Sequence, residues 1–144
     1  MKLFSVKKFL SIFAGAGLLF ISACATGPVN IPGDLSPAEL IQRAQEASDR
    51  NRYNLALQYY QALLNRNATN IDLVCVAEYE IAFIHYKQKK YDISKEEFNQ
   101  LLKRYNTPDE ELLPQEYKKL SNIVLERIAE KEKPRQFFWI KKQG

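Results

Sequence analysis

Apolar residues recur every three or four positions along most of this chain, and short polar segments separate the stretches that show this pattern. Such spacing places apolar side chains on one face of an α-helix. A typical helix start occurs where Ser36 can cap the helix, Pro37 suits its first position and Glu39 completes a capping box. No stretch alternates strictly between apolar and polar residues, as a half-buried strand does. The pattern therefore predicts an all-α fold built from antiparallel helix pairs.

Five helices are expected, with turns around residues 50–52 and 89–90, a polar loop at 65–70 and a short turn before Pro114. In chain order the expected helices cover approximately residues 36–49, 54–64, 71–87, 91–105 and 114–131. The expected apolar positions of the last helix are Tyr117, Leu120, Val124 and Ile128.

The second and fourth of these helices resemble each other at a constant offset of 38 residues (53 to 91). An aromatic residue, a small residue, a second aromatic and a leucine occupy equivalent positions. They are Tyr53, Ala56, Tyr60 and Leu63 in one helix and Tyr91, Ser94, Phe98 and Leu101 in the other. The small residue allows close approach to the preceding helix, and the second aromatic fills the space beside it. The sequence therefore predicts two copies of one helix pair.

The second copy resembles the tetratricopeptide repeat (TPR). Tyr86-Lys87-Gln88-Lys89-Lys90-Tyr91-Asp92 is similar to the Tyr-Lys-Gln-Gly-x-Tyr-Asp turn of that family, and Ile81-Ala82 stands at its Leu-Gly pair. The motif's aromatic positions differ at Glu78 and His85, and Asn106 replaces its final proline. The resemblance implies two TPR units followed by a C-terminal capping helix.

In TPR proteins the first helix of each pair lines a groove that binds segments of other proteins. Carried over by position, the resemblance implies a partner-binding groove formed by Ile41, Gln45, Val76, Tyr79, Phe83, Tyr86 and Lys87. Three of these are aromatic residues on one helical stripe, and aromatic side chains are frequent interface anchors. The alternative interpretation is that this stripe is core against neighbouring helices.

The first 23 residues have the pattern of a secretory signal peptide. Lys2, Lys7 and Lys8 precede an apolar run from Phe9 to Phe20, which is shorter than the roughly 20 residues of a spanning helix. Ile21-Ser22-Ala23-Cys24 resembles the bacterial lipobox. This implies a diacylglyceryl group and fatty acyl chains (palmitate) on Cys24. An ordinary signal peptide with a chance cysteine is the alternative.

The expected organisation is a signal peptide (1–23), a lipidated Cys24 with a flexible tether (24–35), a TPR-like domain (36–131) and a tail (132–144). The chain also resembles the N-terminal part of the BamD (YfiO-like) lipoproteins. The features that they share are the lipobox, the tether, the two repeats with an expected long loop between them, and a helix that begins Glu39-Leu40-Ile41. That family implies an outer-membrane lipoprotein that faces the periplasm and assembles β-barrel proteins with a β-barrel partner. An envelope transport component, binding a solute-binding protein or a small apolar ligand, is the alternative.

Composition excludes several other functions. Removing the three signal-peptide lysines leaves 18 Lys and Arg against 17 Asp and Glu, so we expect no nucleic-acid partner. The chain has one histidine, His85, and no phosphate loop or metal-ligand spacing, so we expect neither an enzyme nor a metal or other cofactor. His85 is interpreted as structural. Cys75 lies in an apolar stretch and is interpreted as a buried thiol, with a reactive thiol as the alternative.

The C-terminal tail combines positive charge with aromatic residues. From residue 131 onward it has five Lys or Arg against one Glu, and Phe137, Phe138 and Trp139 lie between them. Such a segment indicates an interaction site. It packs back onto the last helix or the groove, docks on a partner protein, or lies at the lipid interface.

Overall fold

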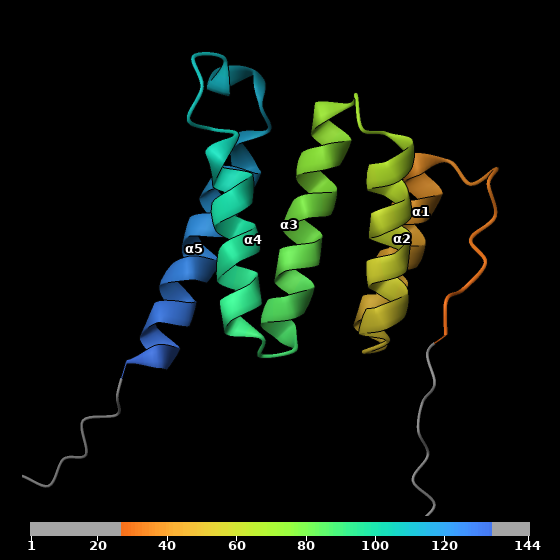
Figure 1. Ribbon diagram of the computed structural model, residues 1–144, viewed down its shortest axis with the longest axis horizontal. Coiled ribbons are helices and arrows are strands. Elements are labelled where there is room, and N and C mark those ends of the chain that lie inside the picture. Colours follow the sequence, from red (N-terminus) through yellow and green to blue (C-terminus); the bar gives the residue numbers. More distant parts are fainter. Residues whose placement is uncertain (1–26, 134–144) are drawn as a thin grey trace, which may run out of the picture.

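The computed structural model describes residues 27–133. In chain order these residues form α1 (Pro37–Asp49), α2 (Tyr53–Arg66), α3 (Ile71–Lys87), α4 (Tyr91–Lys103), the short 3₁₀ helix η1 (Glu110–Leu112) and α5 (Gln115–Glu132). Successive α-helices run in opposite directions (Figure 1). This range contains no strand, so the all-α prediction is confirmed. It also contains no helix that combines the length and the apolar character needed to cross a membrane.

The helices pack in sequence order. Each of the first four contacts the next, and α5 lies against both α3 and α4. In Figure 1, α1 lies behind α2 and α5 lies behind α4. The two ends of the described chain, Gly27 and Lys133, lie at the same edge as the α1–α2 and α3–α4 turns.

Side-chain caps fix two of the helix starts. The Ser36 backbone N–H donates to Glu39 Oε2 at 2.9 Å, and the Glu39 N–H donates to Ser36 Oγ at 3.3 Å, which completes the expected capping box. Asn70 caps α3 by accepting from the Leu73 N–H at 3.2 Å. Because α2 continues to Arg66, the loop between the pairs is only residues 67–70, shorter than expected.

The two turns within the helix pairs have the same backbone structure. The Arg52 N–H donates to Ala47 O at 2.8 Å, and the Lys90 N–H donates to His85 O at 2.9 Å. These bonds belong to the Schellman motif that ends many helices. The residue before each donor has positive φ, 56° at Asn51 and 62° at Lys89. Glycine is favoured at this position, because a side chain is strained there.

Replacing Lys89 with glycine is therefore expected to raise the free energy of unfolding by about 0.5–1 kcal/mol. Urea denaturation followed by circular dichroism would measure the change. Lys90→Gly is the matched control, since φ at Lys90 is −83° and glycine relieves no strain there. Equal stabilisation by both changes would contradict the assignment of strain to Lys89.

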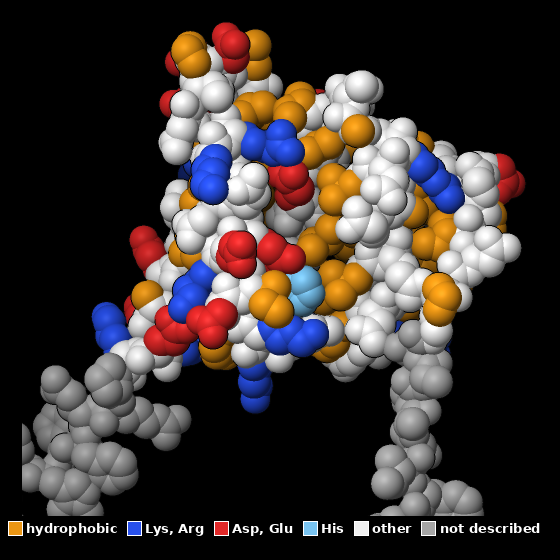
Figure 2. Space-filling view, in the orientation of Figure 1, with side chains coloured by type: hydrophobic (Ala, Val, Ile, Leu, Met, Phe, Trp, Pro, Cys, Tyr) orange, Lys and Arg blue, Asp and Glu red, His pale blue; other side chains and the backbone are white. Residues whose placement is uncertain are grey.

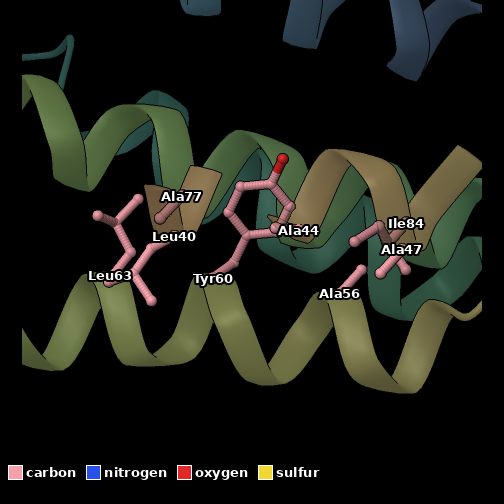
Figure 3. Close-up of a cluster of buried hydrophobic side chains, with 8 residues drawn as sticks. All are labelled: Leu40, Ala44, Ala47, Ala56, Tyr60, Leu63, Ala77 and Ile84. Carbon is pink, nitrogen blue, oxygen red and sulfur yellow. The ribbon is translucent and has the colours of Figure 1, made fainter. Parts of the chain in front are cut away.

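Burial repeats with the same offset as the sequence. Ala56, Tyr60 and Leu63 of α2 are fully buried, as are their counterparts Ser94, Phe98 and Leu101 of α4. The small residues allow the close approach that the sequence predicts. Figure 3 shows Ala56 beside Ala47 of α1, and the Ser94 Oγ donates to Ala82 O of α3 at 2.9 Å.

Two core clusters result. The first joins α1, α2 and α3 around Leu40, Ala44, Tyr60, Leu63 and Ile84 (Figure 3). The second joins α3, α4 and α5 and includes Cys75, Tyr79, Phe98, Leu101, Tyr105, Val124 and Ile128.

One expected core position of α5 is wrong. Val124 and Ile128 are buried, but Leu120 is 39% exposed and Ser121 is buried instead. Ile123 is similarly exposed at 38%. The reason is that α5 packs on α3 and α4 with one side only, and no described element covers the side that bears Leu120.

Part of the segment expected to be a flexible tether is packed on α2. The Arg66 guanidinium donates to Pro32 O at 2.9 Å and to Ile31 O at 3.2 Å. The Val29 N–H donates to Gln58 Oε1 at 2.6 Å. Ile31 and Leu35 pack against the first core cluster. Residues 29–35 therefore belong to the folded domain.

Candidate functional site

The expected groove residues lie on α1 and α3, and α5 borders the same surface. The Lys87 Nζ donates to Ser48 Oγ at 3.1 Å, which links α3 to α1. The Tyr79 and Tyr117 rings lie 5.4 Å apart between centroids, which links α3 to α5. We call this surface the α1–α3–α5 face.

A ladder of aromatic rings follows α3 along this face. Tyr79 stacks on Phe83 at 5.8 Å between centroids, and Phe83 stacks on Tyr86 at 5.7 Å. Phe83 and Tyr86 are half-buried, so each keeps accessible ring surface. Lysines lie over both rings, with the Lys87 Nζ 5.4 Å from the Phe83 centroid and the Lys131 Nζ 5.8 Å from that of Tyr86.

Tyr79 belongs to the core rather than to the accessible part of the face. Only 7% of it is exposed, and its ring packs against Phe98 at 5.6 Å as well as against Tyr117. Burial raises its pKa to about 12. The interpretation of the stripe as core therefore holds for Tyr79, whereas Phe83 and Tyr86 remain accessible to a partner.

Val76 lies at the other end of the stripe, beside a hollow of about 370 Å³. Residues of α3, α5 and the loop between α4 and α5 line this hollow: Asp72, Val76, Leu112, Leu113, Pro114, Glu116 and Tyr117. The Tyr105 hydroxyl holds the loop by donating to Pro114 O at 2.8 Å.

The α1 residues of the expected groove have fewer contacts with the α3 residues of the face. Ile41 is half-buried against the first core cluster, and Gln45 is exposed. Ser48 is the α1 residue that contacts the expected α3 set, through Lys87.

Glu80 is a residue of this face that the expected set lacks. Its carboxyl is half-buried, and burial raises its pKa, although nearby Lys87 acts in the opposite direction. Asp49 of α1 raises the pKa further. A signal for Glu80 was present in the sequence, because it lies one helical turn from both Val76 and Phe83.

The two residues considered for chemistry have structural environments. Cys75 is fully buried, and burial raises the pKa of its thiol, as expected for a structural cysteine. The His85 Nδ1 lies 2.6 Å from Glu97 Oε2, which joins α3 to α4. Within residues 27–133 no group of three or more His, Cys, Asp or Glu side chains is arranged to hold a metal ion.

The other side of the molecule also carries apolar surface. Figure 2 shows hydrophobic side chains gathered between α2 and α4. A hollow of about 220 Å³ lies there, lined by Leu64 and Ile81 together with Gln61, Glu78, Glu97 and Gln100. Cys24 and the expected tail residues Phe137, Phe138 and Trp139 lie outside the described residues.

A protein of Treponema pallidum (strain Nichols), described as uncharacterized, is similar to this chain. It is 36% identical over 118 residues, which is 81% of this chain and 47% of that protein. The chain thus spans about half the length of the curated relative it matches. No protein-family model matches the chain, and no solved structure matches it.

Proposed function

We propose that this protein is a TPR-type scaffold, held at a bacterial membrane by lipid on Cys24, that binds a segment of a partner protein on the α1–α3–α5 face. The observation that carries the binding proposal is the stacked, half-buried pair of Phe83 and Tyr86. Aromatic side chains are enriched in protein interfaces and frequent among the residues that anchor a partner.

Two further observations support the repeat architecture. The Asn51 and Lys89 turns share one hydrogen-bond pattern at the 38-residue offset of the sequence repeat. In addition, α5 packs against both helices of the second pair. This is how the first helix of a following repeat is expected to sit, so α5 covers one side of the second repeat.

The biological setting that we propose is the assembly of β-barrel proteins at the outer membrane, with the domain facing the periplasm. The lipobox and the resemblance to the BamD lipoproteins support this setting. A large outer-membrane β-barrel protein is then the expected partner.

Replacing Phe83 with glutamate is expected to reduce recovery of this partner by about tenfold or more, because the change places a charge on the apolar contact surface. The measurement is affinity purification of the full-length protein from gently solubilised envelopes after brief crosslinking. Circular dichroism of each variant would verify that helical content is preserved.

Ile93→Glu is the matched control, because Ile93 is 46% exposed and lies on α4, outside the α1–α3–α5 face. Equal recovery of the partner by Phe83→Glu and the wild type would refute binding on this face. Recovery of a solute-binding protein and transporter subunits in place of a β-barrel protein would replace barrel assembly with envelope transport.

A further inference from the structure

Glu80 is a carboxylate without a direct partner at the centre of the α1–α3–α5 face. It forms neither a hydrogen bond nor an ion pair with any residue of the described range 27–133. Its electrostatic neighbours come from three helices besides its own: Asp49 of α1, Tyr60 of α2 and Tyr117 of α5. The charge of Glu80 is therefore felt by groups on all of these helices.

The nearby lysine does not neutralise Glu80 by contact. The Lys87 Nζ instead donates to Ser48 Oγ at 3.1 Å and lies over the Phe83 ring. Asp49 adds a second negative charge to the same region. A half-buried carboxylate is costly to leave unpaired, and a cation that reached it would gain a charge-assisted hydrogen bond.

A buried hydroxyl points to the same place. Tyr60 is fully buried, and its hydroxyl has no hydrogen-bond partner among the described residues. Figure 3 shows the ring rising from α2 with the hydroxyl at its far end. This hydroxyl is electrostatically coupled to Glu80, Tyr117 and Asp49. Buried polar groups in proteins are nearly always paired, so the orphan hydroxyl and the unpaired carboxylate leave hydrogen-bonding capacity unused in this part of the molecule.

We propose that Glu80 binds a Lys or Arg side chain of the partner segment, with the Phe83 ring packing against the methylene groups of that side chain. This inference rests on the proposed function, and it adds the chemistry of the partner. Two carboxylates favour a cation, and the neighbouring aromatic rings suit the apolar stem of a basic side chain. An acidic segment would be repelled by Glu80 and Asp49.

The experiment is a selection of short random peptides on the full-length chain in detergent micelles. Parallel selections would use Glu80→Gln and Glu80→Lys. Wild-type protein is expected to select peptides with a Lys or Arg next to an apolar residue. Their affinity should fall about tenfold on Glu80→Gln, since the amide oxygen can still accept a hydrogen bond but carries no negative charge. Glu80→Lys should select Asp or Glu instead.

The controls separate this inference from the proposed function. Glu96→Gln, at an exposed position of α4, should leave peptide affinity unchanged. The inference would be overturned by selected peptides that lack basic residues, lose affinity on Phe83→Glu and keep their affinity on Glu80→Gln. The scaffold function would then still stand. If no selected peptide loses affinity on Phe83→Glu, the scaffold function fails as well. If a synthetic peptide of residues 131–144 outcompetes every selected peptide, the chain's own tail binds at Glu80. That result would overturn the inference that a separate partner binds there.

Discussion

Replacing Phe98 with alanine is expected to lower the free energy of unfolding by about 3–5 kcal/mol. Phe98 is fully buried on α4, in the cluster that joins α3, α4 and α5. Its ring packs against Tyr79, which in turn contacts Tyr117 of α5. The substitution leaves a cavity where three helices meet. Since small domains have a total stability of about 5–15 kcal/mol, a large share of it would be lost.

Urea denaturation of the full-length protein would measure this loss, with circular dichroism and tyrosine fluorescence as separate probes. Ile93→Ala on the same helix is the control and should change stability by less than about 0.5 kcal/mol, because Ile93 is largely exposed. Similar destabilisation by the two substitutions would mean that Phe98 is not a core residue. Loss of α5 packing ahead of global unfolding would appear as non-coincident transitions.

Replacing Cys24 with alanine is expected to move the protein from the membrane fraction to the soluble fraction almost completely. Each buried methylene of an acyl chain contributes about 0.8 kcal/mol to membrane binding, and stable anchoring needs more than one chain. The substitution removes the thiol to which all of these chains are proposed to be linked. Fractionation of cells after an alkaline wash, with the intact mass of each product, would measure the effect.

The chain's other cysteine provides the control. Cys75→Ala removes a buried thiol and should leave both membrane association and the lipid mass unchanged. A Cys24→Ala protein that stays in the washed membrane after removal of residues 1–23, as its intact mass would show, would contradict lipid anchoring at this residue.

The helices and turns could be predicted because their signals are local. The capping box of Ser36 and the spacing of the apolar residues lie within one or two helical turns. The internal repeat also identified the most buried positions of α2 and α4 in advance, since the same small and aromatic residues recur where two helices approach.

The features that sequence reasoning missed depend on distant parts of the chain. Arg66 donates hydrogen bonds to the carbonyl groups of Ile31 and Pro32, more than thirty positions away in the sequence. No local sequence pattern predicts that contact. Leu120 has the spacing of a core residue, but burial also requires a neighbouring element on its side. Glu80 has the spacing of the face residues, but its partial burial and its neighbour Asp49 depend on helices distant in the sequence.

The α2-bound segment limits how far the domain can stand from its anchor. With lipid on Cys24, only five residue steps separate the bilayer surface from Val29, whose N–H is already bound to Gln58. A fully extended chain covers at most about 3.6 Å per residue, so Val29 lies at most about 18 Å from Cys24. On the proposed lipid anchor, the start of the described chain, at the edge that carries the α1–α2 and α3–α4 turns, stays close to the lipid headgroups (Figure 1). On this proposal, partners at the same membrane surface are the ones that the tethered domain meets.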